Sequence, residues 1–367
     1  MKKGLWFSRA FLALNLISGI LLLLSISSLY IDPRNWVLPS LLGLGFLQLF
    51  TLNFFLFICS FLINKKYIWL SLIFMVFGLT ELPSHLEFNI DEEKRENDIS
   101  ILSLNVRNFD LYNWSENKKT RDRIMRTILR AKSDIICLQE FFNTTDPNHD
   151  FKTLETILEF KKKYSAHVEY TATVKNTEHW GIATFSSFPI VGKGSIKFQG
   201  GSNNVCIYTD LFVDLDTLRV YNTHLASVHL GKDDYNYLND VGNELNQDVD
   251  RMGTLLKKLS AAYVIRAQQA AKVKEHMRNS PYPVILCGDF NDTPTSYTYR
   301  VLSDEMNDSF RKKGNGFGAT YNGKLPFLRI DYILADGNFD LLSHEVMHSD
   351  ISDHYPVKVR LGLRSDL

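Results

Sequence analysis

Residues 284–292 read Val-Ile-Leu-Cys-Gly-Asp-Phe-Asn-Asp, and this stretch is the best guide to the fold. The four apolar residues between Pro283 and Gly288 predict a short, buried β-strand. Polar side chains follow directly where that strand ends. Taken alone, Gly-Asp-Phe-Asn is also typical of a tight turn, in which Asp and Asn side chains hydrogen-bond to the nearby backbone.

Apolar strands that lead into polar residues occur at three other places along the chain. The strands predicted at 99–106, 135–138 and 219–223 lead to Asn105, Glu140 and His224. Further strands are predicted at 182–185, 205–213 and 330–334, and helices at 114–132 and 248–277. Many short strands with few long helices indicate a layered α/β sandwich rather than a Rossmann alternation. Cys137, Cys206 and Cys287 lie in predicted strands, and we expect them to be core residues.

Two motifs late in the sequence add acidic and imidazole groups. Arg329-Ile-Asp-Tyr332 opens a predicted strand, and Ser352-Asp-His-Tyr-Pro356 follows it. Each motif has an ordinary structural explanation, since Ser-Asp-His is able to cap a helix. A single glutamate after a strand, such as Glu140, is usually just solvent-exposed. No motif therefore establishes a site by itself.

Together, these motifs supply the parts of a site for a divalent cation. The oxygen donors are Glu140, Asp289, Asp353, Asn105 and Asn291, and the imidazoles are His224 and His354. Carboxylate and amide oxygens suit Mg²⁺ or Mn²⁺ rather than zinc. An imidazole transfers protons near neutral pH, and Asp331 is able to hold one imidazole in the required tautomer. Oxygen ligands beside imidazoles predict phosphoester hydrolysis, because the cation neutralises developing charge while a base activates water.

The order of these motifs resembles that of the endonuclease/exonuclease/phosphatase superfamily, which includes DNase I-like nucleases, abasic-site endonucleases, neutral sphingomyelinases and inositol-phosphate 5-phosphatases. The resemblance covers about residues 99–363 and rests most on Gly288-Asp-Phe-Asn291 and Ser352-Asp-His354. It implies a DNase I-like, four-layered α/β sandwich, in which two packed β-sheets are flanked by helices. It also implies an enzyme that depends on Mg²⁺, with Mn²⁺ as an alternative.

The resemblance implies a role for each acidic and amide residue of the set. Glu140 would be the principal metal ligand, with Asn105 and Asp353 close to the metal. Asp289 would position or activate the attacking water, and Asn291 would orient the phosphate. The number of metal ions is left open.

The resemblance assigns the imidazoles in the same way. His354, paired with Asp331, would be the catalytic imidazole. His224 would be a second catalytic histidine that also contacts substrate, as in the DNase-like and sphingomyelinase-like branches. Abasic-site endonucleases lack this histidine, so that branch is disfavoured. Arg107 is a further candidate for substrate binding, and the identity of the general base stays open.

One segment departs from the pattern of the superfamily. Residues 231–259 form an apparent insertion directly after the strand that ends in His224. It begins polar and acidic and then places Met252, Leu255, Leu256 and Leu259 at helical spacing. This pattern fits a substrate-selecting lid and a helical hairpin packed at the edge of the sandwich equally well.

The first 86 residues predict a transmembrane region with helices at about 10–31, 36–63 and 67–83. The first two helices lie in uncharged runs of 22 and 30 residues, which exceed the roughly 20 residues that a bilayer requires. The third uncharged run, 67–80, has only 14 residues, so an interfacial or buried helix is an alternative there. An acidic linker at 87–98 then leads to a catalytic domain at 99–367.

The positive charges predict the orientation of these helices. Lys2, Lys3 and Arg9 precede the first helix, and Lys65 and Lys66 lie between the second and the third. Positive residues favour the cytoplasmic side, so three spans would place everything after Pro83 outside the cytoplasm. Two spans would leave it in the cytoplasm. We expect a multi-pass integral membrane protein with an extracytoplasmic catalytic domain.

Composition narrows the choice of function. The chain has 367 residues, with 41 Lys and Arg against 41 Asp and Glu, which excludes a strongly basic nucleic-acid binder. Residues 91–367 hold 35 basic and 38 acidic side chains, a net charge of −3. Four cysteines in a chain of this length exclude a disulfide scaffold, and their spacing is not that of a zinc site.

The expected partners are therefore the lipid bilayer and a phosphoester substrate, either nucleic acid or a phospholipid head group, with no protein partner. The family resemblance favours a nuclease-like phosphodiesterase. The membrane helices favour a phospholipid phosphodiesterase or phosphatase, of the sphingomyelinase or inositol-phosphate kind. An inactive, membrane-tethered binding module is a weaker alternative, because the full set of polar residues is present.

Overall fold

The computed structural model describes residues 2–93, 97–117, 119–198, 203–228, 248–323, 325 and 327–364. The chain divides into two compact units. One comprises Met1–His85, Ser227–Gln268 and Asp292–Arg300, and the other comprises Leu86–Ala226, Gln269–Asn291 and Val301–Leu367. We call them the N-terminal unit and the sheet unit.

The sheet unit contains two six-stranded mixed sheets. The first has the order β13-β14-β2-β3-β5-β4, and only β2 and β3 run parallel. Its strands are β13 (Phe339–Val346), β14 (Val357–Leu363), β2 (Ile99–Asn105), β3 (Ile135–Thr144), β5 (Glu178–Ser186) and β4 (Ser165–Val174).

The second sheet has the order β10-β12-β9-β8-β7-β6, and only β8 and β9 run parallel. Its strands are β10 (Asn307–Asp308), β12 (Asp331–Ala335), β9 (Val284–Asp289), β8 (Asp216–His224), β7 (Val205–Val213) and β6 (Ile190–Lys197). A separate antiparallel pair joins β1 (Leu86–Phe88) to β11 (Asn315–Phe317).

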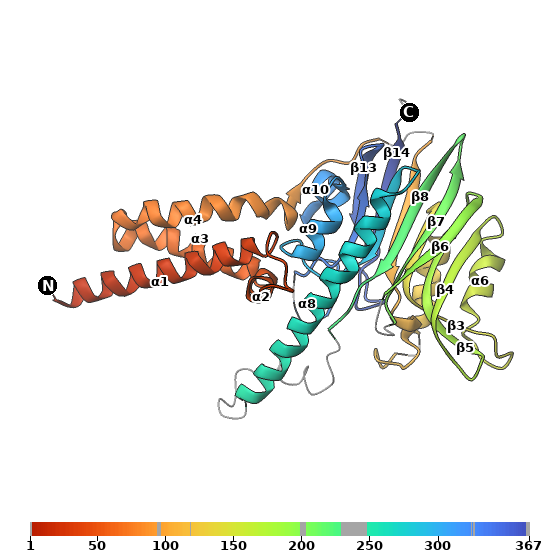
Figure 1. Cartoon of the computed structure of the whole chain (residues 1–367), viewed down its shortest axis with the longest axis horizontal. Coiled ribbons are helices and arrows are strands. Elements are labelled where there is room, and N and C mark those ends of the chain that lie inside the picture. Colours follow the sequence, from red (N-terminus) through yellow and green to blue (C-terminus); the bar gives the residue numbers. More distant parts are fainter. Residues whose placement is uncertain are drawn as a thin grey trace. The chain divides into compact units, whose positions relative to one another are not determined.

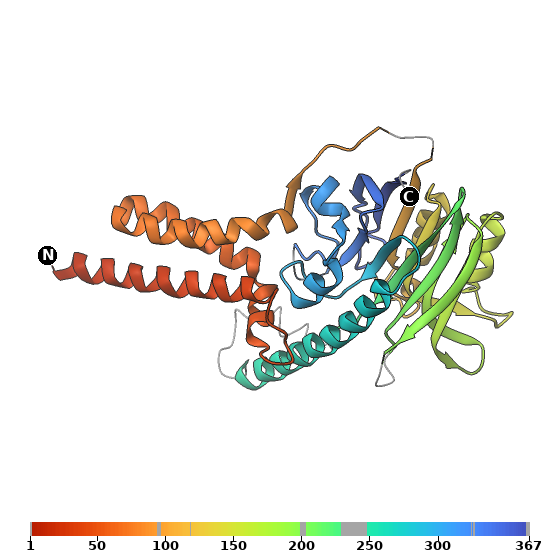
Figure 2. The same cartoon turned by 45° about the horizontal axis from the view of Figure 1, so that its top comes forward.

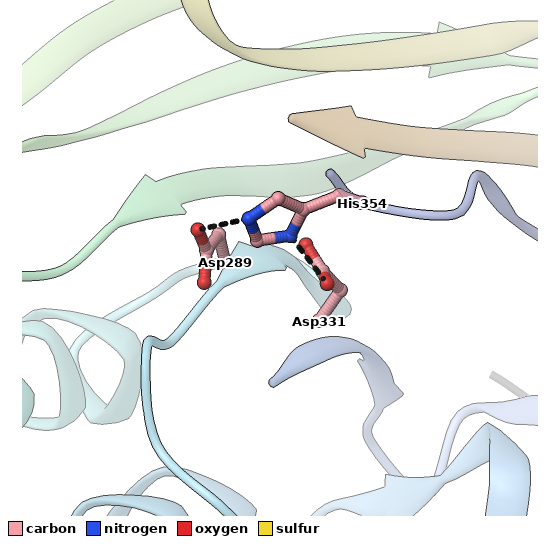
Figure 3. A group of neighbouring side chains, drawn as sticks. All are labelled: Asp289, Asp331 and His354. Carbon is pink, nitrogen blue, oxygen red and sulfur yellow. Dashed lines mark hydrogen bonds and ion pairs between the residues drawn. The ribbon is translucent and has the colours of Figure 1, made fainter. Parts of the chain in front are cut away.

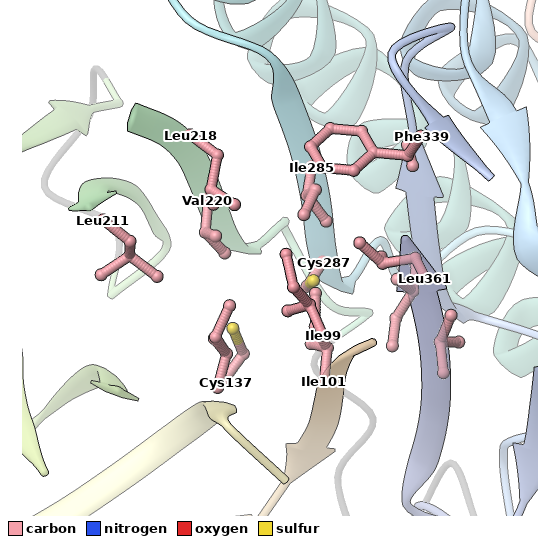
Figure 4. Packing of buried hydrophobic residues seen from close by; sticks show 14 of the residues in the cluster. Ile99, Ile101, Cys137, Leu211, Leu218, Val220, Ile285, Cys287, Phe339 and Leu361 are labelled. Carbon is pink, nitrogen blue, oxygen red and sulfur yellow. The ribbon is translucent and has the colours of Figure 1, made fainter. Parts of the chain in front are cut away.

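The core of the unit lies between the two sheets (Figure 4). Ile99 and Ile101 of β2 pack in one cluster with Val220 of β8 and with Ile285 and Cys287 of β9, and all are buried. Alternate residues of a strand point to opposite faces, so Leu102 and Leu104 of β2 enter a different cluster. The three predicted core cysteines are free and buried, as expected.

Helices cover the outer faces of the sheets (Figures 1 and 2). Ile124 and Ile128 of α5 (Thr120–Arg130) and Ile157 of α6 (Thr153–Phe160) pack on the outer face of the first sheet. On the second sheet, Tyr221 Oη of β8 lies 2.8 Å from His276 Nδ1 of α8 (Asp248–Arg278). The short helices α9 (Tyr297–Ser303) and α10 (Ser309–Lys313) follow β9. The predicted sandwich of two packed sheets flanked by helices is confirmed.

The sequence analysis did not predict several strands, and it placed the start of one helix too early. The strands β4, β6, β13 and β14 were not expected, because polar residues or glycines interrupt their apolar runs. The helix predicted at 114–132 begins only at Thr120. By contrast, α8 matches the helix predicted at 248–277 within one residue.

The predicted insertion at 231–259 lies mostly outside the described residues, so its proposed lid and hairpin are not described. Its last part, from Asp248 on, is the beginning of α8, which continues unbroken to Arg278. Of the predicted apolar row, Leu255 is buried, whereas Met252 and Leu256 are exposed.

Among its described residues, the N-terminal unit has three helices that are long and apolar enough to cross a membrane, Trp6–Ser27, Phe46–Ile63 and Lys65–Ser84. The first is α1 (Lys2–Ser27). The predicted helix at 36–63 is two helices, α2 (Leu38–Leu44) and α3 (Phe46–Ile63), which are separated at Gly45. Helical turns at Lys65–Tyr67 and Leu82–Ser84 extend α4 (Ile68–Glu81) to 20 residues, about 30 Å.

Buried polar side chains connect α1, α3 and α4, which lie side by side (Figure 1). Asn53 Nδ2 of α3 donates to Ser18 Oγ of α1 at 2.9 Å. Ser71 Oγ of α4 donates to Asn15 Oδ1 of α1 at 2.7 Å. Hydrogen bonds between helices of this kind support helix association inside a bilayer. The outward surface is apolar, with Leu62 86% and Trp69 72% exposed.

Candidate active site

Three of the predicted site residues lie side by side in the second sheet because of strand register. Asp289 at the end of β9 is the register partner of His224 in β8 and of Asp331 in β12. Strand β9 lies between the other two, so the three residues form one row across the sheet. Motifs that are far apart in sequence are thus brought to a single edge.

Gly288 allows this row to form. Its φ is +139°, a conformation that other residues rarely adopt, and a Cβ atom there would lie 2.0 Å from the carbonyl oxygen of Thr223. Only glycine lets β9 approach β8 this closely at the residue before Asp289. The first position of Gly-Asp-Phe-Asn therefore requires glycine for steric reasons.

Glu140 reaches the site from the first sheet through a break in strand pairing. The register of β3 against β5 shifts between Leu138 and Phe141, and Glu140 lies in that shift with φ at 49°. A left-handed conformation costs a residue with a side chain on the order of 1–2 kcal/mol. Bulges of this kind redirect side chains beside active sites. Accordingly, Glu140 is partly exposed within an otherwise buried strand.

Asn105 connects the two sheets at the site. Its Nδ2 donates to Glu140 Oε1 at 3.2 Å and to Asp289 Oδ2 at 3.0 Å. Its Oδ1 accepts from the backbone N–H of Arg107 at 3.0 Å. In this orientation the amide group holds two carboxylates together. To act as the expected metal ligand, Asn105 would have to turn its amide oxygen toward them.

His354 lies between two carboxylates (Figure 3). Its Nδ1 is 2.9 Å from Asp331 Oδ2, and its Nε2 is 3.7 Å from Asp289 Oδ2. All three side chains are almost completely buried. The hydrogen bond to Asp331 makes Nδ1 the protonated nitrogen and fixes the ring orientation, which is the pairing expected from the sequence.

Burial and neighbouring charges act in opposite directions on these groups. Burial acts to lower the pKa of His354, but Asp331, Asp289 and Asp353 outweigh it and hold that pKa well above its usual value. Burial raises the pKa of Asp289, although His354 and His224 oppose the shift. The imidazole and the carboxylate thus stabilise each other's charged forms.

His224 and Asn291 complete the surroundings of Asp289. His224 Nε2 lies 3.6 Å from Glu140 Oε1 and 3.8 Å from Asp289 Oδ2. Among the described residues, this nitrogen has no hydrogen-bond partner, and neither has Asp331 Oδ1. Asn291, at φ 53°, donates its backbone N–H to Asp289 Oδ1 at 2.8 Å and its Nδ2 to the carbonyl oxygen of Leu225 at 3.0 Å.

Arg107 and Asp353 border a hollow beside the site. Arg107 Nε lies 3.2 Å from Asp353 Oδ2, and its guanidinium lies over the ring of Trp114 at 4.9 Å. The hollow has a volume of about 190 Å³. Its polar lining consists of Arg107, Asp110, Ser115, Thr120, Asn322, Asp350, Ser352 and Asp353. It therefore presents three carboxylates and one guanidinium.

One group of the described residues brings its donor atoms close enough together to hold a divalent cation. Asp289, Asp331 and His354 place one donor atom each within 4.8 Å of one another. In that set, however, the imidazole Nδ1 already pairs with Asp331, and the two carboxylates are only 1% and 2% exposed. Glu140 and Asp353, at 30% and 26%, are the accessible carboxylates. Hard oxygen donors of this kind fit Mg²⁺ or Mn²⁺.

The sequence analysis did not identify the buried polar side chains that support the site. Gln139 Nε2 of β3 donates to Asn222 Oδ1 of β8 at 2.7 Å, and both side chains are completely buried between the sheets. Thr320 Oγ1 accepts from the backbone N–H groups of Ile330 and Asp331, each at 3.0 Å. Gln139 and Asn222 could have been identified from the sequence, because each is a polar residue in a largely apolar strand close to a site residue. Thr320 had no such signal.

A pair of mixed sheets with these acidic, amide and imidazole groups at one edge defines an enzyme of the phosphoester hydrolase class. The chain belongs to the endonuclease/exonuclease/phosphatase family, whose profile matches residues 102–354. Members of this family are metal-dependent phosphoester hydrolases. A second profile, a domain of unknown function (DUF8431), matches residues 8–85. None of the curated proteins compared with this sequence matches it.

Several solved structures share the fold. A family protein from Bacteroides thetaiotaomicron is 20% identical, with a TM-score of 0.54 over 74% of this chain and 100% of that one. A mannosyl-6-phosphatase from the same organism is 21% identical, with a TM-score of 0.52 over 72% and 100%. The human nocturnin catalytic domain is 18% identical, with a TM-score of 0.53 over 75% and 96%. At these identities the similarity concerns the fold.

Glu140→Gln should abolish metal-dependent hydrolysis without unfolding the protein, because it removes a charge at a partly exposed position and little packing. Turnover of a soluble diester and the thermal melting curve measure the two effects. Glu155→Gln, on the exposed side of α6, is the matched control and should behave as wild type. Metal-dependent activity that survived in Glu140→Gln would contradict the assignment.

His354→Ala should lower kcat by about 10²–10⁴-fold, as expected for a group that transfers a proton or stabilises developing charge. Steady-state kinetics on the same diester test this. His179→Ala provides the control, since that ring stacks on Tyr170 instead. A decrease of only a few-fold would make His354 a structural residue.

Proposed function

We propose that this protein is a membrane-anchored, divalent-metal-dependent phosphodiesterase whose site works outside the cytoplasm. The observation that carries the proposal is the convergence of polar side chains from both sheets on the buried carboxylate of Asp289. Asn105, Asn291, His224 and His354 all surround it. A purely structural role would not require two imidazoles at one buried acid.

The donor set supports a metal ion held by Glu140 and Asp353, with Asn105 beside them. Glu140 and Asp353 are accessible, and carboxylate and amide oxygens suit Mg²⁺, with Mn²⁺ as an alternative. A bound cation would stabilise the negative charge that develops on the phosphoryl group. His224 Nε2 has no hydrogen-bond partner among the described residues, so it is available to contact the same phosphoryl group.

The remaining residues would handle the phosphate and the proton. Asp289, oriented by the N–H of Asn291, would hold the attacking water by accepting its hydrogen bond. His354, held at Nδ1 by Asp331, would direct Nε2 toward the same region and act on the phosphoryl oxygen or the leaving group. His224 and the amide group of Asn291 would orient the phosphate. Fixed donors at a buried site need little rearrangement during the reaction, which is the usual source of such catalysis.

The hollow beside Asp353 favours a phospholipid head group over a nucleic-acid strand. Asp110, Asp350 and Asp353 oppose one guanidinium there, and hydroxyl and amide groups provide the rest of the polar lining. A nucleic-acid backbone needs a series of basic contacts, and residues 91–367 carry a net charge of −3. A compact, hydroxyl-bearing head group is compatible with this lining.

The membrane assignment rests on the three apolar helices and on the basic residues at their ends. Polar contacts between α1, α3 and α4 and the apolar outward surface support a bundle in lipid. Basic residues favour the cytoplasmic side of a membrane, and here they lie before the first helix and between the second and third: Lys2, Lys3, Arg9, Lys65 and Lys66. An odd number of spans would then direct the sheet unit outward.

The full-length protein, purified in detergent with Mg²⁺, should hydrolyse phospholipid head groups in mixed micelles faster than single-stranded DNA or RNA. The panel should contain sphingomyelin, an inositol phospholipid, both nucleic acids and bis-p-nitrophenyl phosphate. Chelation with EDTA should stop the reaction, and Glu140→Gln protein controls for contaminating enzymes. Faster cleavage of nucleic acid would support the nuclease alternative, and no cleavage of any substrate would contradict a phosphodiesterase.

A reporter fused after Leu367 should be active only outside the cytoplasm, as three spans require. The matched fusion after Lys66 should report the cytoplasm. Deletion of 67–80 should invert the result for the fusion after Leu367, because the number of spans becomes even. A cytoplasmic reporter on the undeleted chain would show that α4 does not cross.

A further inference from the structure

The segment Asp292–Arg300 directly follows Asn291, yet it belongs to the compact unit of the N-terminal helices. Thr295 is completely buried, and Thr293 and Ser296 are nearly so. A polar connecting segment is normally exposed, since its backbone groups need water. Burial of this segment therefore calls for specific partners.

Three parts of the N-terminal helical region meet at Thr295. Ser28 Oγ, just after α1, donates to the carbonyl oxygen of Thr295 at 2.8 Å. His85 Nε2, just after α4, lies 2.8 Å from Thr295 Oγ1, and both contacts are buried. Gly43 of α2 is in close contact as well, because a Cβ atom there would lie 2.3 Å from the Thr295 carbonyl oxygen.

The start of the segment is held by a buried ion pair. Arg266 Nε of α8 lies 3.2 Å from Asp292 Oδ2, with 2% and 1% of the side chains exposed. Asp292 Oδ1 also accepts the backbone N–H of Thr293 at 3.1 Å. Asp292 is joined by one peptide bond to Asn291, whose N–H orients the Asp289 carboxylate. Only a few residues of the chain therefore separate Thr295 from the turn at Asp289–Asn291.

We propose that Ser28, Gly43 and His85 position the segment around Thr295, so that full catalytic activity requires the intact membrane helices. The catalytic part of this inference rests on the proposed function. The N-terminal region is then a component of the active enzyme, in addition to being a tether. The physical reason is that catalytic groups must be held within about 0.5 Å of their productive geometry. These buried polar contacts connect residues 1–85 to the segment after Asn291.

The test compares two glycine variants of the full-length protein in nanodiscs of phosphatidylcholine and phosphatidylglycerol. In Gly43→Ala the new methyl group would collide with the Thr295 carbonyl and with Ser28 Oγ, at 2.3 and 2.6 Å. In Gly45→Ala it would meet only the Leu42 carbonyl oxygen, at 3.6 Å, an ordinary contact. The two changes are identical in chemistry and lie two residues apart.

Hydrogen–deuterium exchange of peptides covering 292–300 should be faster in Gly43→Ala and unchanged in Gly45→Ala. For bis-p-nitrophenyl phosphate, kcat should fall about tenfold or more in Gly43→Ala, while KM stays within about twofold. Thr295→Val, which keeps the shape and loses the hydroxyl, should reproduce both effects. Thr295→Ser, which keeps the hydroxyl, should restore most of the activity.

Wild-type exchange and kcat in both Gly43→Ala and Thr295→Val would overturn the positioning role. Faster exchange with unchanged kcat would also overturn it, because the contacts would then be merely structural. If the wild-type protein cleaved no phosphoester, the proposed function would be wrong, whatever the exchange measurements showed. Exchange that was then unchanged in Gly43→Ala would separately exclude the positioning of the segment.

Discussion

A buried carboxylate at Asp289 is the constraint on which the site depends. Removing a charged group from water is costly unless hydrogen bonds and opposite charges compensate for it. Here Asn105 comes from the first sheet, Asn291 from the following turn, and His354 from the loop between β13 and β14. Burial raises the pKa of Asp289, and the neighbouring imidazoles oppose that rise. Each compensating group is also a candidate for contact with substrate, so the stability of the buried acid and the chemistry of the site share the same atoms.

The two sheets meet this constraint in different ways. In the second sheet, regular pairing places His224, Asp289 and Asp331 in one row, with Gly288 allowing the close approach. In the first sheet, Glu140 reaches the site only through a shift of register and an unfavourable φ. Strained residues of this kind persist where the surrounding packing holds them in place, and they are concentrated at functional sites. The apolar core and the buried Gln139–Asn222 hydrogen bond hold the sheets together closely enough to maintain that geometry.

The proposed placement in a membrane would change what such a site is suited to do. The fold family includes enzymes for several phosphoesters, and similarity at about 20% identity does not select among them. The hollow with its three carboxylates argues against a long polyanion, and the apolar helices argue for a substrate that is encountered at a lipid surface. The contacts of Thr295 with Ser28 and His85 would give the helices a second role, as support for the chain that follows Asn291.

Local features could be predicted from the amino-acid sequence alone: the apolar strands, the three apolar helices, the family and the polar residues at the strand ends. These are readable because strand pattern, helix length and motif order depend on neighbours in the chain. The sequence also indicated that Asp331 pairs with His354, through motif order alone. Three further facts emerged only from the folded chain: Asn105 bridges Glu140 and Asp289, Glu140 lies in a bulge, and Thr295 is buried against Gly43. Those facts depend on register and packing between segments up to about 250 residues apart, and no local pattern of residues encodes such distances.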